Sequence, residues 1–320
     1  MAALLFWAIA MTCLLLTGAG FSYNWGGPLA SEVFEQILAD KDIDTVTRDR
    51  LFDSNGQFES VMAELQTSKD AEDQKRADAL LTSVVGIFNH MNNAFMYKQF
   101  EFENPPSVQH SVAAFLSRFH AIFTLNQDCL LEQHYNPVFG TAQNWARLYQ
   151  PGMRFPSTFR PTGARQDKFA LMEPHPPFTT ISTSGAQPYV KLHGSVNWVE
   201  SDVGKRILIM GGEKAVSIGL YSILRWYHEQ FREMLLRPSA RLMIIGYSFS
   251  DAHINDAIVE GLENGLKIYV VDPFALNALK RDPRIEKKRS QAVIGISTRP
   301  LTATFGGDRN AHAQLSQFFV

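Results

Sequence analysis

The chain has 320 residues, of which 45% are apolar and 19% are charged, and this composition excludes a disordered protein. A chain of this length buries a large core, either as one large α/β domain or as a domain with an added lobe. The formal net charge of -2 gives no indication of a nucleic-acid partner or of an anionic membrane surface.

The first 16 residues are apolar throughout, and the first charged residue is Glu32. This run is too short for a membrane span and lacks the basic start of a secretory signal. Ala8-Ile-Ala10 does resemble a signal cleavage site, so a signal or anchor stays as an alternative. We instead expect a cytoplasmic protein, in which residues 1–10 are an extension or Met11 is the natural start.

Five short apolar runs are predicted to be buried strands, because each stops at a polar or glycine-rich turn. They cover residues 13–17, 121–125, 189–192, 242–245 and 267–271. Apolar residues at helical spacing predict helices over 29–38, 220–235 and 251–262. Ser250 or Asp251 is expected to cap the last of these.

Two segments do not follow this alternation of short strands and helices. Residues 45–120 are charged and helical in pattern, and we interpret them as a helical lobe. Residues 136–188 hold eight prolines, which few helices tolerate. This Pro-rich insertion is expected to be a lid over a cleft or an assembly surface.

Strands that alternate with helices predict one α/β domain over 1–320, with a Rossmann-like parallel sheet and helices on both faces. Polar or glycine signatures follow each predicted strand. Ligands of open α/β sheets bind outside the carboxyl ends of the strands, so these signatures predict one shared cleft.

The first signature is Gly18-Ala19-Gly20-Phe21-Ser22, between a strand and a helix. Glycines allow the backbone to approach a pyrophosphate, and free N–H groups bind its charge. The dinucleotide fingerprint requires a third glycine where this chain has Tyr23. Taken alone, the loop fits a purely structural turn equally well.

Three further signatures each have a structural alternative. Asn126 and Asp128 could orient a ribose hydroxyl or a water, or cap a helix. His193, in Leu-His-Gly-Ser, could accept a proton or be a hydrogen-bonded structural residue. Gly246-Tyr-Ser248-Phe-Ser-Asp251 could hold a phosphate or ribose, or form a capped helix start.

Together, these motifs resemble the sirtuin family: Gly-Ala-Gly-x-Ser, Thr-x-Asn-x-Asp, His-Gly and Gly-x-Ser occur in that order over about residues 13–272. Lys191-Leu-His-Gly-Ser-Val-Asn-Trp198 is most similar to the bacterial branch found in antiviral defence. The resemblance implies catalytic roles for Asn126 and His193. It implies that NAD is bound by Gly18, Ala19, Gly20, Phe21, Ser22, Pro28, Asp128, Gly246, Ser248 and Asp251, and Asp272 is added for its place at a strand end.

Two departures from the family pattern are visible. Protein-deacylating sirtuins carry four zinc-binding cysteines after His-Gly, whereas this chain has only Cys13 and Cys129. We therefore expect no metal and no disulfide. The chain also reads Gly27-Pro28-Leu-Ala-Ser31 where deacylases have an acidic-arginine segment.

The resemblance implies a prokaryotic NAD hydrolase that releases nicotinamide and ADP-ribose in antiviral defence. It further implies a homo-oligomer, or a separate activating chain such as a helicase-like ATPase or an Argonaute-type protein. Alternatives are a protein deacylase or ADP-ribosyltransferase, a non-catalytic sensor of NAD or ADP-ribose, and a generic α/β domain with coincidental loops.

Overall fold

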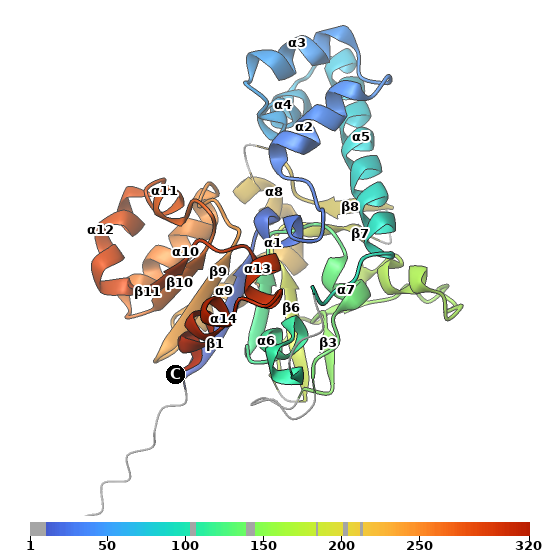
Figure 1. Cartoon of the computed structure of the whole chain (residues 1–320). Coiled ribbons are helices and arrows are strands. Elements are labelled where there is room, and N and C mark those ends of the chain that lie inside the picture. Colours follow the sequence, from blue (N-terminus) through green and yellow to red (C-terminus); the bar gives the residue numbers. More distant parts are fainter. Residues whose placement is uncertain (1–10, 103–106, 139–144, 184, 201–203, 212–213) are drawn as a thin grey trace, which may run out of the picture.

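The computed structural model describes residues 11–102, 107–138, 145–183, 185–200, 204–211 and 214–320. Residues 1–10, which are expected to be an extension, with a signal or anchor as the alternative, lie outside the described residues. The centre of the molecule is a seven-stranded sheet whose neighbouring strands are all parallel (Figure 1). Helices cover both of its faces, which confirms the predicted Rossmann-like fold class.

The order of strands across the sheet is β11-β10-β9-β1-β2-β6-β3. The chain leaves the central strand β1 in one direction to β2 and later returns on its other side through β9. This reversal places a ligand crevice at the carboxyl ends of the central strands. The strands are β1 Thr12–Thr17, β2 Ala121–Thr124, β3 Arg147–Tyr149, β6 Ala186–Lys191, β9 Ala240–Ile245, β10 Lys267–Val271 and β11 Val293–Ser297.

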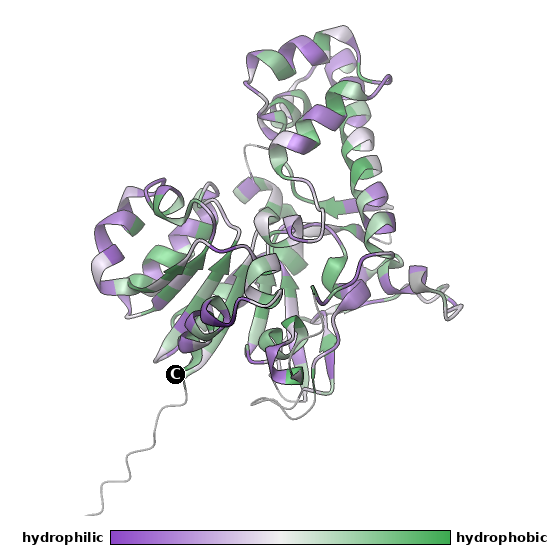
Figure 2. Cartoon of the chain, in the orientation of Figure 1, coloured by the Kyte–Doolittle hydropathy of each residue, from purple (hydrophilic) through white to green (hydrophobic). Residues whose placement is uncertain are grey.

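Alternate side chains of β1 enter two separate cores. Leu14 and Leu16 pack with the apolar faces of α9 (Ser222–Leu235) and α10 (Ala252–Glu263). Cys13 and Leu15 pack on the other face with α6 (Val112–Leu116), α13 (Leu301–Phe305) and α14 (Arg309–Ser316). Each fully buried leucine contributes roughly 2 kcal/mol to folding. Figure 2 shows the resulting apolar sheet between helices with hydrophilic outer faces.

A third core lies inside a helical layer that projects from the carboxyl edge of the sheet (Figure 1). Ile37, Leu51, Met62 and Leu80 are fully buried in it. This layer covers much of the predicted lobe 45–120, but it also includes a helix that precedes residue 45. Its helices are α2 Ala30–Ala39, α3 Thr45–Asp53, α4 Phe58–Thr67 and α5 Ala71–Phe95.

The Pro-rich segment 136–188 contributes regular structure to the fold. It supplies β3, which pairs with β6, and the short antiparallel pair β4 (Met153–Arg154) and β5 (Glu173–Pro174). A second antiparallel pair follows the sheet strand β6, formed by β7 (Gly194–Glu200) and β8 (Lys205–Leu208).

The remaining helices connect these elements. They are α1 Ala19–Tyr23, α7 Leu130–His134, α8 Lys214–Leu220, α11 Ala275–Leu279 and α12 Pro283–Ala292, with short 3₁₀ turns at Val108–His110, Arg165–Phe169 and Gln317–Phe319. In the described part of the chain, none of the helices has the length and apolarity that a membrane span requires.

Candidate functional site

A cavity of about 720 Å³ opens where the central strands end. Cavities of this size are typical of small-molecule sites. Every residue predicted to bind NAD or to act in catalysis lines it except Phe21. The lining includes Gly18, Ala19, Gly20, Ser22, Pro28, Asn126, Asp128, His193, Gly246, Ser248, Asp251 and Asp272.

Phe21 lies in the core instead of the cavity wall. Its side chain is buried, and its ring centroid lies 5.1 Å from that of Trp25. This aromatic contact fixes the short helix α1 and thereby the position of Ser22, the next residue.

The glycines after β1 and β9 allow two backbone loops to touch. Gly18 N–H donates to the Ile245 carbonyl and Gly20 N–H to the Gly246 carbonyl, each at 3.0 Å. A Cβ on Gly246, whose φ is +64°, would lie 2.4 Å from the Gly20 carbonyl carbon. The glycines therefore have a packing role in addition to the one expected from sequence, and these two N–H groups are not available to an anion.

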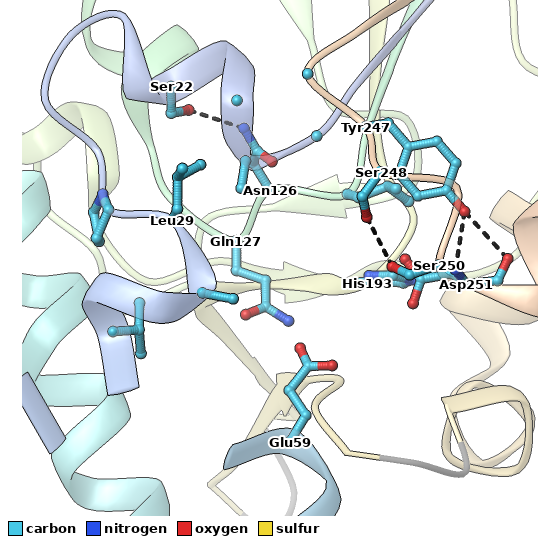
Figure 3. A pocket seen from close by; sticks show the side chains of 18 of the residues that line it. Ser22, Leu29, Glu59, Asn126, Gln127, His193, Tyr247, Ser248, Ser250 and Asp251 are labelled. Atoms are coloured by element: carbon cyan, nitrogen blue, oxygen red, sulfur yellow. Dashed lines mark hydrogen bonds between the residues drawn. The ribbon is translucent and has the colours of Figure 1, made fainter. Parts of the chain in front are cut away.

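Ser22 joins Asn126 and Asp128 in a buried chain of hydrogen bonds. The Ser22 hydroxyl donates to Asp128 Oδ2 at 2.7 Å and accepts from Asn126 Nδ2 at 2.9 Å. Asp128 Oδ1 accepts the Leu130 N–H at 2.9 Å, so this carboxylate also satisfies the first N–H group of α7. The Asn126 amide is thereby held in one orientation at the cavity wall (Figure 3).

A buried ion pair stabilises the backbone next to this chain of hydrogen bonds. Lys191 Nζ lies 2.8 Å from Glu132 Oε1 and also donates to the Asp128 carbonyl. Burial would lower the pKa of Lys191, but the acidic groups around it, above all Glu132 and then Cys129 and Asp128, together outweigh burial and raise that pKa above its ordinary value. Two elements, β6 and α7, thus fix the backbone that carries Asp128.

His193 follows β6 and is 3% exposed. Gly194 has a φ of +74°, and a Cβ there would lie 2.1 Å from the Ile207 carbonyl, so only glycine fits the turn that orients His193. His193 Nε2 lies 3.0 Å from Nε2 of His253 on α10. Burial lowers the pKa of His193 well below its ordinary value, and the Lys214 ammonium lowers it further. The imidazole is therefore neutral near pH 7 and able to accept a proton.

Asp251 does not cap α10 through its side chain, although it occupies the N-cap position. The predicted position of the N-cap is thus correct for Asp251, but a capping side-chain hydrogen bond is missing, because the carboxylate pairs with Lys214 Nζ at 2.8 Å instead. The same ammonium lies 2.8 Å from Glu59 Oε2. Burial would lower the Lys214 pKa, but the two carboxylates raise it overall. Lys214 thus links the helical layer to the sheet beside His193.

The loop after β9 carries a strained backbone. Phe249 is a non-glycine residue with a φ of +56°, and its side chain is buried. Asn255 Nδ2 donates to the Phe249 carbonyl at 2.9 Å, and Asn255 Oδ1 accepts from the Tyr247 hydroxyl at the same distance. These bonds hold Ser248 at the cavity wall, where its hydroxyl lies 2.9 Å from that of Ser250 (Figure 3).

Asp272 lies at the end of β10, as its place in the sequence predicts. Its Oδ1 accepts the Phe274 N–H at 2.7 Å, and burial raises the pKa of its carboxyl. Phe274 lines the cavity while its side chain is 71% exposed. An aromatic face and a carboxylate thus border the end of the cavity formed after β10.

Several lining residues were not found from sequence. Phe58, Glu59, Phe88 and Met91 come from the helical layer, and Lys214 comes from α8. No local motif marks them, because they reach the cavity only through the docking of α4, α5 and α8. No described residue of the Pro-rich segment 136–188 lines the cavity, so the helical layer occupies the place expected of a lid.

The cavity wall presents a hydrogen-bond acceptor to whatever occupies it. Among the described residues, none donates to the Asn126 amide oxygen, which is left as an oriented acceptor in the cavity lining. Over the described ranges, no three His, Cys, Asp or Glu side chains are grouped as a metal site requires. Cys13 and Cys129 are both buried free thiols.

Comparison with known proteins gives a family match. The model of the SIR2-like domain matches residues 120–293, which is more than half of the chain. This range contains Asn126, Asp128, His193, Gly246 and Asp272. A search of curated proteins finds no match.

Solved Sir2 structures are similar over nearly the whole chain. A Sir2 homologue in complex with NAD is 11% identical, with a TM-score of 0.38, and the match covers 96% of this chain and 90% of that one. A mutant Sir2 homologue with 2'-O-acetyl ADP-ribose is 12% identical, with a TM-score of 0.42 and coverages of 97% and 94%. Sir2Tm bound to a propionylated peptide is 12% identical, with a TM-score of 0.40 and coverages of 96% and 92%.

Proposed function

The chain belongs to the SIR2-like domain family, and on that premise we propose that it hydrolyses NAD to nicotinamide and ADP-ribose. The observation that carries the proposal is that an oriented amide, Asn126, and a neutral imidazole, His193, line the same cavity. Hydrolysis at a ribosyl carbon needs an oriented sugar, one positioned water and a group that accepts its proton.

The two ends of NAD would bind at different parts of this cavity. Its nicotinamide ribose would lie against Asn126 and His193, with Asp128 and Ser22 supporting Asn126 from behind. Its adenosine end would extend toward Ser248 and Asp272, where hydroxyl and carboxylate groups can bind ribose oxygens. The Ala19 region between them would face the pyrophosphate.

Nicotinamide leaves as a neutral molecule, so its departure needs little acid catalysis. The barrier lies in the positive charge that develops on the ribosyl carbon, as in glycoside hydrolysis. We assign to Asn126 the orientation of the attacking water or of a ribose hydroxyl. We assign to His193 the proton released when water adds, so that one water is consumed and one proton is freed for each nicotinamide.

The absence of zinc-binding cysteines from the sequence supports hydrolysis over protein deacylation. Deacylases of the family carry a four-cysteine zinc ribbon after the His-Gly motif, whereas this chain has no cysteine after Cys129. Buried neutral His193 serves either reaction, so the products decide between them.

We further propose a role in antiviral defence, supported by the motif resemblance around 191–198 and 246–251. Uncontrolled NAD loss would harm the cell, so the activity needs control. That control would come from homo-oligomerisation or from a separate chain, such as a helicase-like ATPase or an Argonaute-type protein.

Product analysis tests the proposal. Purified protein, over a range of concentrations, is incubated with NAD alone and with NAD plus an acetylated peptide. Nicotinamide and ADP-ribose without peptide support hydrolysis. Nicotinamide release only with peptide, together with acetyl-ADP-ribose, would show a deacylase instead. Tight NAD binding without any turnover at every concentration would show a sensor.

A further inference from the structure

His193 and His253 form a pair of imidazoles that the sequence motifs did not assign. His193 follows β6 and His253 lies in the first turn of α10, and their Nε2 atoms are 3.0 Å apart. A hydrogen bond between two imidazole nitrogens requires one donor and one acceptor. In the neutral pair, therefore, only one of the two rings carries hydrogen on Nε2, and the other carries it on Nδ1.

A third imidazole, His228 on α9, lies against the second. The ring centroids of His253 and His228 are 5.3 Å apart, close to the 5.2 Å between His253 and His193. His228 Nε2 lies 2.9 Å from the Leu192 carbonyl. A carbonyl only accepts, so His228 keeps its hydrogen on Nε2 and takes no part in exchange at that atom. It packs against His253 as a fixed neighbour.

Charged groups face this pair from three elements. The Lys214 ammonium of α8 acts on both rings, while the carboxylates of Asp251 and Asp256 act on His253 from α10 and its N-cap. Glu59 of α4 holds Lys214 from the other side. Burial lowers the pKa of all three histidines, that of His228 to about 4. The pair is therefore neutral near pH 7 and can take up one proton.

We propose that His253 is a positioning residue for His193, which fixes its ring through the Nε2–Nε2 hydrogen bond and shares the proton that His193 accepts. This inference rests on the proposed hydrolysis. The water or ribose hydroxyl gives its proton to Nδ1 of His193, the nitrogen that is not bonded to His253. The hydrogen on His193 Nε2 then passes to Nε2 of His253, which becomes the cation. His253 is less buried than His193, so it returns the proton to solvent.

The direction of transfer follows from the surroundings. His193 is more deeply buried, so a positive charge is less favourable there. Lys214 acts against a positive charge on both rings, but Asp251 and Asp256 favour the charged form of His253. Moving the charge from His193 to His253 therefore lowers the free energy of the protonated pair.

Two variants separate this role from packing. His253→Phe keeps a ring but removes the hydrogen bond, and His253→Gln keeps an acceptor, the amide oxygen, that can hold the Nε2–H of His193 but cannot take over its proton. We expect His253→Phe to lower kcat for nicotinamide release roughly 10-fold or more with little change in KM. The acid limb of its pH profile should move to lower pH, because the charge is no longer shared. His253→Gln should recover part of kcat, but the acid limb of its pH profile should stay at the lower pH. Exposed His90→Gln on α5 is the matched control.

A second readout does not depend on turnover. Nitrogen NMR of the histidine rings reports the tautomer of His193 in the wild type and in His253→Gln, which serves if the Phe variant does not fold. We expect the His193 ring signals and their titration to change on substitution. Unchanged signals would overturn the pair whether or not NAD is hydrolysed. Changed signals with wild-type kcat and pH profile in an active enzyme would overturn the proton-sharing role alone.

Discussion

The Ser22 hydroxyl and the Asp128 carboxylate are hydrogen-bonded at 2.7 Å, although 106 positions separate them in the chain. This bond joins α1 to the loop after β2, and the same hydroxyl orients Asn126. Catalytic groups need to be fixed in this way, because small displacements cost large factors in rate.

Ser22→Ala removes the donor to Asp128 and the acceptor of Asn126 at once. We expect turnover of NAD to fall roughly 10-fold or more and the free energy of unfolding to fall by about 1–2 kcal/mol. Kinetics and thermal unfolding measure the two effects. Ser60→Ala, on the exposed side of α4, is the control and should change neither. Unchanged turnover in Ser22→Ala would mean that Asn126 does not depend on Ser22.

Gly246→Ala tests the contact between the two glycine loops. The new Cβ would lie 2.4 Å from the Gly20 backbone, and alanine disfavours a φ of +64°. We expect a loss of about 2–4 kcal/mol in the free energy of unfolding, measured with denaturant. Gly86→Ala on α5 is the matched control, because nothing lies within 4 Å of its new Cβ. It should stabilise the helix by about 0.5–1 kcal/mol.

His228 predicts a dependence of stability on pH. Burial lowers its pKa from 6.5 to about 4 in the folded protein. Between these values the unfolded chain binds more protons, so the stability that neutral His228 contributes is present above pH 6.5 and is lost as the pH falls toward 4. We expect His228 to account for a loss of about 2 kcal/mol in the free energy of unfolding on acidification. This is less than the full pKa difference would give, because the ring keeps some contact with solvent.

Unfolding curves at pH 7, 5.5 and 4.5 for wild type and His228→Gln measure this share. The variant should lose less stability on acidification than the wild type does. His175→Gln, at an exposed loop position, should follow the wild type. If the free energy of unfolding depends on pH equally in all three proteins, His228 is not the group responsible.

Lys214→Met removes the cation between Glu59 and Asp251. We expect a loss of about 1–3 kcal/mol, because two partly buried carboxylates lose their partner. The Lys214 charge also lowers the pKa of His193. Its removal should therefore raise that pKa and move the acid limb of the pH–rate profile to higher pH. Exposed Lys75→Met breaks the Lys75–Glu72 pair and is the control, which should leave the free energy of unfolding unchanged.

The sheet could be predicted because its strands are continuous apolar runs that end at glycine or polar residues. All five predicted strands lie in the sheet, and their polar ends meet at one cavity. Within this sheet two strands were missed, β3 and β11, and both lie at its edges. β3 has three residues inside a Pro-rich segment, and β11 has partly exposed side chains, so neither has a strong apolar pattern.

The parts of the site that escaped prediction depend on tertiary contacts. Glu59 and Lys214 lie on ordinary amphipathic or short helices and meet only when the helical layer docks. His253 was visible in the sequence after Ser250-Asp251, but its role depends on distance from a residue 60 positions away. Hydrophobic periodicity indicates which residues of one element are buried, but it does not indicate which distant residues that element contacts.

The most direct measurement of the central claim is nicotinamide release from NAD by the wild type beside His193→Ala and His175→Ala, with folding checked by circular dichroism. The account predicts that the wild type releases one ADP-ribose for each nicotinamide, and that His175→Ala does so at the same rate as the wild type. It predicts that His193→Ala loses roughly 100-fold or more in kcat while still folding. Undiminished release by folded His193→Ala would contradict the assignment of His193. The absence of NAD binding by the wild type, measured by calorimetry, would contradict the proposed function itself.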